Sequence, residues 1–188
     1  MPPTGSMGKR KLICLTGFMG CGKTTIGRRL ARQIGCNFAD LDTQIEERAG
    51  LRINEIFAQK GETAFRDLEH ELLSENLERA AGLDRPTVLA LGGGTYAQAR
   101  NVELLRANGI VLWLDVPFET LLARCVAKSH RPLFRDAESF RQLYAQRKPF
   151  YEQADVRIVA DGSPHQIVER ILAQGIFEQA RLGGQVTA

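Results

Sequence analysis

The sequence predicts an α/β protein in which a parallel sheet carries a phosphate-binding loop after its first strand. Short apolar segments alternate with segments whose apolar residues recur at helical spacing, the order expected of strand–helix–strand units. Residues 17–24, which read GFMGCGKT, fit the P-loop pattern of glycine, four residues, glycine, lysine and a hydroxyl residue. An apolar segment precedes this loop and a helical pattern follows it, which is the context that phosphate binding requires.

Five apolar segments, each bounded by turn residues, are the predicted strands: 12–15, 37–40, 87–91, 110–115 and 156–159. The first predicted helix follows the P-loop, where Ile26, Leu30 and Ile34 share one face. The other predicted helices span residues 43–49, 62–81, 117–127, 137–151 and 164–173. Helical connections between the strands imply a parallel sheet. Trp113, within the fourth strand, is expected in the core.

Length and composition indicate one domain with an ordinary core. Of the 188 residues, we expect a leader at 1–10, a P-loop domain at 11–174 and a C-terminal tail at 175–188. Lysine and arginine number 25 against 22 acidic residues, and because the excess of +3 is spread along the chain, no nucleic-acid partner is expected.

Membrane spans and disulfides are not expected either. No segment has the apolar length that a membrane span needs, so we expect no membrane partner. The four cysteines show no Cys-x-x-Cys spacing, which favours a reduced, cytoplasmic compartment. No heptad pattern or exposed apolar stripe calls for a second copy, and we expect a monomer.

The P-loop residues have distinct chemical roles. Glycine has no Cβ, so we expect Gly17, Gly20 and Gly22 to take positive φ angles that turn backbone N–H groups toward phosphate oxygens. Lys23 should reach the β- and γ-phosphates, and the Thr24 hydroxyl should ligate Mg²⁺, which prefers oxygen ligands. The plainer alternative, a glycine-rich turn that ends in Lys-Thr by chance, is much weaker, since the full pattern lies in its proper context.

Two carboxylates follow the second predicted strand, at the sheet edge where open α/β proteins bind ligands. Asp40 and Asp42 are one residue apart, so we expect them to serve different partners, one the Mg²⁺ and its waters, the other an acceptor hydroxyl. The alternative is that Asp42 is the N-cap of the helix that begins near Thr43. From these residues alone, the two interpretations are equally supported.

A glycine triplet and several arginines are further candidate binding residues, since planar guanidinium groups suit recognition of a carboxylate or a phosphate. Gly92-Gly93-Gly94 follows the third predicted strand, where missing side chains let a small substrate approach the backbone. Arg66 has Glu69 three residues on, on the same helical face, although an isolated arginine is more often a solvated surface charge. Arg131 lies in a polar stretch at 128–136 that could close over the phosphates, and Arg147 precedes Pro149, expected to break or kink its helix.

A P-loop alone does not name a reaction, but the Asp-x-x-Gly and Asn-Lys-x-Asp strings usual in GTPases do not occur. Six separated motifs carry further information: residues 17–24, Asp40-Leu41-Asp42, 61–66, Gly92-Gly93-Gly94, Arg131-Pro132-Leu133, and Arg147 with Pro149 and Tyr151. In this order they resemble the motifs of the shikimate kinase family, and the resemblance covers residues 11–173. It implies a nucleoside-monophosphate-kinase-like three-layer sandwich with a five-stranded parallel sheet in the order 2-3-1-4-5, a substrate-binding region at about 40–70 and a lid at about 128–136.

The resemblance also implies a reaction, in which ATP donates its γ-phosphate to the 3-hydroxyl of shikimate. The implied catalytic residues are Lys23, Asp42 and Arg131. The implied nucleotide-binding residues are Gly20, Cys21, Gly22, Lys23, Thr24, Thr25, Arg124 and Arg131, with the loop 161–164 beside the base. The implied shikimate-binding residues are Asp42, Arg66, Gly92, Gly93, Gly94 and Arg147, and the pocket wall is Phe57, Phe65, Glu69, Pro132 and Leu133. Mg²⁺ would be bound by Thr24 and, through water, by Asp40.

Some features leave alternatives open. Thr95-Tyr96 is bulkier than the residues expected after the glycine triplet, and the segment 125–130 lacks the glycines often found before the lid. A kinase of another small hydroxy acid, such as gluconate, would share the scaffold. A non-catalytic ATP-binding shikimate sensor is a further alternative, although it would need neither a lid arginine nor an acceptor base.

Overall fold

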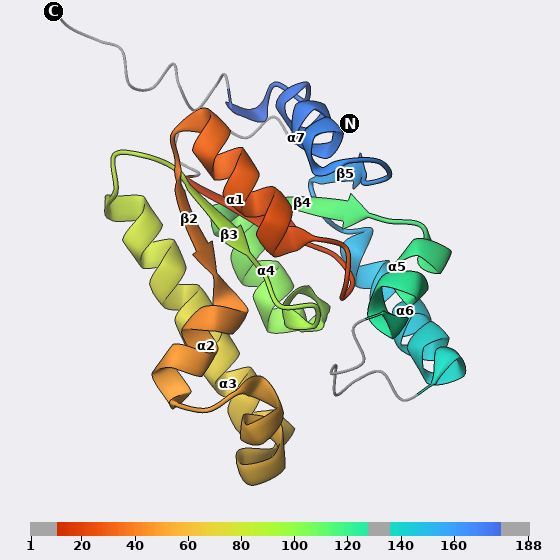
Figure 1. Ribbon diagram of the computed structural model, residues 1–188. Helices are drawn as coiled ribbons and strands as arrows, with labels where there is room; N and C mark the ends of the chain where they lie inside the picture. Colours follow the sequence, from red (N-terminus) through yellow and green to blue (C-terminus); the bar gives the residue numbers. More distant parts are fainter. Residues whose placement is uncertain (1–10, 128–135, 178–188) are drawn as a thin grey trace, which may run out of the picture.

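The computed structural model describes residues 11–127 and 136–177. Their five strands form one parallel sheet (Figure 1). The strand order is β2-β3-β1-β4-β5, as the resemblance implied. The strands are β1 (Leu12–Thr16), β2 (Asn37–Asp40), β3 (Thr87–Ala90), β4 (Gly109–Asp115) and β5 (Val156–Val159). The expected leader, most of the lid with Arg131, Pro132 and Leu133, and the end of the chain from residue 178 lie outside the described residues.

Helices cover both faces of the sheet, which gives three layers. On one face α1 (Lys23–Ile34) packs beside α7 (Pro164–Leu172), and on the other α3 (Ile53–Gly82) packs beside α4 (Ala99–Asn108) (Figure 1). The short α2 (Leu41–Ala49) lies against α3, while α5 (Phe118–Val126) and α6 (Ala137–Tyr151) lie beyond the carboxyl end of β4. In the described ranges, no helix combines the length and apolarity that crossing a bilayer demands.

Three helical boundaries differ from the sequence expectation. Helix α2 begins at Leu41, because Asp40 and not Asp42 is its N-cap. Helix α3 begins at Ile53, since a helical segment precedes Gly61, whose φ of 81° interrupts the helix before the expected start. Pro149 does not break α6, which continues to Tyr151, although a proline has no N–H for a helical hydrogen bond.

Helix α4 was not expected at all. Its buried residues are Asn101, Val102 and Leu105. One of these three is polar, so the helix lacks the apolar stripe by which an amphipathic helix is detected in a sequence. The polar residue is buried because its amide has partners in the tertiary structure, described below.

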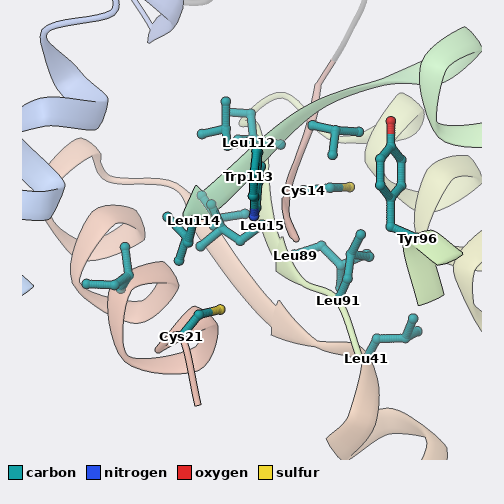
Figure 2. Packing of buried hydrophobic residues seen from close by; sticks show 14 of the residues in the cluster. Cys14, Leu15, Cys21, Leu41, Leu89, Leu91, Tyr96, Leu112, Trp113 and Leu114 are labelled. Atoms are coloured by element: carbon teal, nitrogen blue, oxygen red, sulfur yellow. The ribbon is translucent and has the colours of Figure 1, made fainter. Parts of the chain in front are cut away.

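The core lies on both faces of the central strands. Every residue of β1 is buried, as expected of a parallel strand with helices on both sides. Trp113, at 3% exposure, is a core residue as predicted. Figure 2 shows it among Leu112, Leu114 and Leu15, with the sulfur of Cys14 directed toward the ring of Tyr96. Near the end of the described chain Ile176 and Phe177 are buried too, so packing extends at least that far.

Candidate active site

The P-loop connects β1 to α1 and has the backbone that its glycines predict. Gly17, Gly20 and Gly22 have φ angles of 138°, 83° and 98°, which L side chains rarely adopt. At Gly17 there is also no room, because a Cβ would lie 2.8 Å from the carbonyl oxygen of Leu114. The Lys23 ammonium donates hydrogen bonds to the carbonyl oxygens of Gly17 (2.8 Å) and Phe18 (3.3 Å), so its charge is held against the loop.

The expected nucleotide-binding residues that the structure describes, all but Arg131, gather around the start of α1. Cys21 is buried, with its sulfur 3.7 Å from the Lys23 ammonium, and Arg124 of α5 donates to the carbonyl oxygen of Gly20 at 3.2 Å. Thr24 and Thr25 line a hollow of about 520 Å³ between α1 and α7. His165 of α7 lines the same hollow, whereas the residues of the expected base-contacting loop, 161–164, do not line it.

Asp40 combines two roles at the end of β2. Its Oδ1 accepts hydrogen bonds from the backbone N–H groups of Asp42 (3.1 Å) and Thr43 (3.4 Å), which caps α2. Its Oδ2 accepts a hydrogen bond from the Thr24 hydroxyl at 2.6 Å. The capping function that was one alternative for Asp42 therefore belongs to Asp40.

The paired oxygens of Thr24 and Asp40 suit a hard divalent cation, and they lie beside the phosphate loop. Among the described residues, no group of three or more His, Cys, Asp or Glu side chains could hold a metal ion. A cation at this place would therefore have few protein ligands, as is usual for Mg²⁺, which keeps several waters and binds substrate phosphates.

A second cavity, of about 490 Å³, lies beside the P-loop and brings together residues from five segments. We call it the acceptor cavity. It is lined by Met19, Thr24, Asp40, Asp42, Thr43, Glu46, Ile53, Phe57, Phe65, Arg66, Glu69, Gly92, Gly93, Gly94 and Arg147. The described part of the expected pocket wall, Phe57, Phe65 and Glu69, is all present. Helix α2, which carries Asp42, is held on α3 by the ion pair of Arg48 with Glu75 at 2.8 Å.

The Asp42 carboxyl is in an unusual electrostatic setting. Burial is the main cause that raises its pKa to about 6, and the nearby carboxylates of Asp40, Glu69 and Glu46 act in the same direction. The Lys23 ammonium opposes them and lowers the pKa. At neutral pH the group is thus still mainly a carboxylate, but it binds a proton more readily than an exposed aspartate does.

Arg66 is an oriented side chain and not the solvated surface charge that was the alternative. Its side chain is 13% exposed and its guanidinium forms an ion pair with Glu69 at 2.9 Å, and the Glu69 side chain is only 1% exposed. Glu62 adds a longer contact at 3.3 Å from an exposed position. The guanidinium also lies over the Phe65 ring, 5.0 Å from its centroid. The Glu69 contact was predicted from its spacing; the Glu62 contact, four residues before Arg66, was not.

The glycine triplet is required by its neighbours as much as by any ligand. None of its three φ angles lies in the left-handed region. A Cβ on Gly92 would lie 2.6 Å from Oδ1 of Asp42, and one on Gly94 would lie 2.8 Å from Nη2 of Arg66. Polar side chains from α2 and α3 therefore converge on Gly92 and Gly94, where only glycine leaves them space, whereas a Cβ on Gly93 would meet its nearest neighbours at an ordinary 3.5 Å.

Arg147 of α6 also lies close to the triplet. Its Nη1 would lie 3.5 Å from a Cβ on Gly93, and its guanidinium lies 5.9 Å from the centroid of the Phe18 ring. One turn further along α6, the Tyr151 hydroxyl donates to the carbonyl oxygen of Gly93 at 2.5 Å, which fixes the helix to the triplet. Two guanidinium groups thus border one cavity from two helices, an arrangement suited to an acid with a planar carboxylate.

The bulky pair after the triplet points into the protein. Thr95 and Tyr96 are both fully buried, and the Tyr96 hydroxyl donates to the carbonyl oxygen of Gln153 at 3.2 Å. Neither residue lines the acceptor cavity, so their size does not narrow it. Sequence reasoning missed what Thr95 does instead: its hydroxyl donates to Glu69 at 2.6 Å. No local spacing signals this contact, because the two residues are far apart in the chain.

Comparison with known proteins agrees with this geometry. The family model described as shikimate kinase matches residues 19–175. A curated relative, the shikimate kinase of Persephonella marina, is 43% identical over 164 residues, which cover 86% of this chain and 97% of the relative. The solved structure of shikimate kinase from Acinetobacter baumannii in complex with shikimate has a TM-score of 0.79 and 35% identity, and the match covers 94% of this chain and 98% of that one.

A gluconokinase from Sinorhizobium meliloti has a similar structure, with a TM-score of 0.54, 18% identity, and coverage of 93% of this chain and 95% of that one. That likeness extends to the fold alone, so it does not favour gluconate as the acceptor. The family match and the curated relatives agree with the P-loop and with the acceptor cavity. The chain therefore belongs to the shikimate kinase family and is an ATP-dependent kinase of the P-loop type.

Proposed function

We propose that this kinase transfers the γ-phosphoryl group of ATP to the 3-hydroxyl of shikimate, giving shikimate 3-phosphate and ADP. The observation that carries the proposal is the acceptor cavity, where two arginines and the Asp42 carboxylate meet the glycine triplet beside the P-loop. An acceptor with one carboxylate and several hydroxyls matches these groups in charge and in hydrogen bonding. The shikimate complex of the Acinetobacter baumannii relative supports the choice of acid.

The nucleotide side of the proposal uses the P-loop. The backbone N–H groups of Gly20, Cys21 and Gly22 bind phosphate oxygens, and Lys23 places its ammonium against them. Phosphoryl transfer needs mainly positioning and charge neutralisation, which these groups supply without covalent chemistry. Thr25 and Arg124 complete the nucleotide site, and Arg131 comes from the lid to the transferring group.

We propose Mg²⁺ as the divalent ion that accompanies ATP, held by the hydroxyl of Thr24 and, through water, by the carboxylate of Asp40. The bound ion would neutralise charge on the phosphate oxygens. Because the capping bonds and the Thr24 contact fix Asp40, its carboxylate is held in place before any ligand binds.

On the acceptor side, Asp42 orients the reacting hydroxyl and accepts its proton. Its carboxylate is the expected form at neutral pH, and its raised pKa makes it a better proton acceptor than an exposed aspartate. Arg66 and Arg147 bind the carboxylate of shikimate from two sides, and the backbone N–H of Gly94 donates to a substrate hydroxyl. In this proposal the enzyme acts as a cytoplasmic monomer.

ADP release from Mg-ATP in a coupled assay tests the proposal, with shikimate, with gluconate and without acceptor. We expect release that depends on shikimate. Release with gluconate alone would refute the acceptor while leaving the phosphate chemistry in place. ATP binding without release in any arm would favour the non-catalytic sensor.

A further inference from the structure

A chain of hydrogen bonds, buried at its centre, leads from His70 of α3 through Asn101 of α4 to Arg66 in the acceptor cavity. His70 contacts Asn101 of α4, with 2.6 Å between Nδ1 and Oδ1, and the Asn101 amide nitrogen donates to the carbonyl oxygen of Thr95 at 3.0 Å. The Thr95 hydroxyl donates to Oε1 of Glu69 at 2.6 Å, and Oε2 of Glu69 accepts from Arg66 at 2.9 Å. Glu69, Thr95 and Asn101 are each 0% exposed.

The donor and acceptor roles in this chain follow from chemistry. A carbonyl oxygen only accepts, so the Asn101 amide must turn its NH₂ group to Thr95 and its oxygen to His70. The Nδ1 atom of His70 therefore carries a proton and donates. The Glu69 carboxylate only accepts, so both the Thr95 hydroxyl and the Arg66 guanidinium donate to it. Each hydrogen bond in the chain therefore has one defined donor and one defined acceptor.

The Thr95 hydroxyl has a specific task in this arrangement. A buried carboxylate is costly unless its oxygens are bonded, and Thr95 satisfies the oxygen of Glu69 that Arg66 does not. Without that hydroxyl, the Glu69 carboxylate would lose the contact that fixes its rotation. A Glu69 carboxylate that can rotate would orient Arg66 less firmly. The other contacts of the guanidinium are the Phe65 ring and the longer contact to Glu62, whose side chain is 66% exposed and gives little orientation.

We propose that Thr95 is a positioning residue, which Asn101 and His70 hold in place and which orients Arg66 through Glu69. This inference rests on the proposed function, in which Arg66 binds the carboxylate of the acceptor. Thr95 does not line the acceptor cavity, so its effect on the substrate is transmitted through the Glu69 carboxylate.

The test compares Thr95→Val, which keeps the shape of the side chain without its hydroxyl, with Thr95→Ser, which keeps the hydroxyl. We expect Thr95→Val to raise KM for shikimate about tenfold, since a hydrogen bond to a charged group is lost. We expect kcat to change by less than about twofold and KM for ATP to stay the same, because the P-loop is untouched. Thr95→Ser is expected to behave as the wild type.

Two results with an active enzyme would overturn the positioning role. One is an unchanged KM for shikimate in Thr95→Val. The other is an equal increase of KM in Thr95→Val and Thr95→Ser, which would show that the packing of the side chain matters and its hydroxyl does not. If circular dichroism shows that Thr95→Val does not fold, the decision passes to His70→Leu and His70→Asn. His70→Asn keeps an N–H donor near the position of Nδ1, whereas His70→Leu does not. Only His70→Leu should therefore raise KM for shikimate. A wild-type protein that releases no ADP with shikimate would refute the proposed function itself.

Discussion

Replacing Gly94 with alanine tests whether the glycine triplet exists to make room for Arg66. The backbone at Gly94, with φ −107° and ψ −8°, is open to any residue, so the change introduces no backbone strain. The new Cβ would lie 2.8 Å from Nη2 and 2.9 Å from Nη1 of Arg66. Ordinary contact begins near 3.4 Å, so the guanidinium must retreat by about 0.6 Å, the difference between these distances.

That retreat disturbs the 2.9 Å bond between Arg66 and Glu69. A hydrogen bond to a charged group contributes about 1.5–3 kcal/mol. If the bond to the shikimate carboxylate weakens by the same amount, KM for shikimate rises by about ten- to a hundredfold. The loss inside the protein lowers the free energy of unfolding by about 1–3 kcal/mol, which a typical total of about 5–15 kcal/mol tolerates.

The assay is steady-state ADP release at 25 °C with saturating ATP and varied shikimate, and circular dichroism confirms that the variant is folded. Gly82→Ala is the matched control, since a Cβ at Gly82 meets nothing within 4 Å and the residue lies outside the site. We expect the control to keep the wild-type KM. A folded Gly94→Ala protein with wild-type KM for shikimate would refute the reasoning that Arg66 occupies this space.

Three further predictions follow from the geometry of the site and the core. Lys23→Ala removes the ammonium that is held against the P-loop, so kcat for ADP release should fall by at least about a hundredfold, with a small change in KM for shikimate. A kcat near that of the wild type would show that Lys23 has no catalytic role. Asp42→Asn should lower kcat by about 10²–10⁴-fold. The same variant should have a higher Tm than wild type at pH 8, because the pKa of Asp42 is raised in the folded state and the wild type therefore loses stability as pH rises through about 6. This difference in Tm should shrink toward pH 4, where the Asp42 carboxyl is protonated. A difference in Tm that is constant from pH 4 to pH 8 would contradict the raised pKa. Gly27→Ala places a Cβ 2.6 Å from Cε2 of Phe38 and 3.2 Å from Cδ1 of Leu15. This overpacking should lower the free energy of unfolding by about 1–3 kcal/mol and lower Tm by several degrees in a thermal melt. An unchanged Tm would show that the Phe38 ring can move aside without loss of stability.

Local patterns predicted the parts of this protein whose cause is local. The P-loop needs positive φ at three glycines, and the sequence shows them at the required spacing. The pairing of Arg66 with Glu69 follows from three residues of separation on a helix. Helix α4 was missed because a buried asparagine interrupts its apolar pattern, and that asparagine is explained only by Thr95 and His70.

The role of Asp40 shows the same limit at a single residue. Both Asp40 and Asp42 are chemically suited to cap a helix or to face a metal ion. Their spacing in the chain does not decide between them, whereas the start of α2 at Leu41 does. Asp40 then caps the helix and contacts Thr24, which leaves Asp42 in the cavity.

The amino-acid sequence by itself determined the order of the five strands and of the helices other than α4, the phosphate-binding loop and the set of charged residues available for a kinase site. These follow from backbone preference and side-chain periodicity, which act over a few neighbouring residues. Only the tertiary structure decided which of those charges meet. The contact between Thr95 and Glu69 and the approach of Arg66 to Gly94 join segments distant in the chain. Such contacts depend on how α3, α4 and the sheet pack together, which no local pattern encodes.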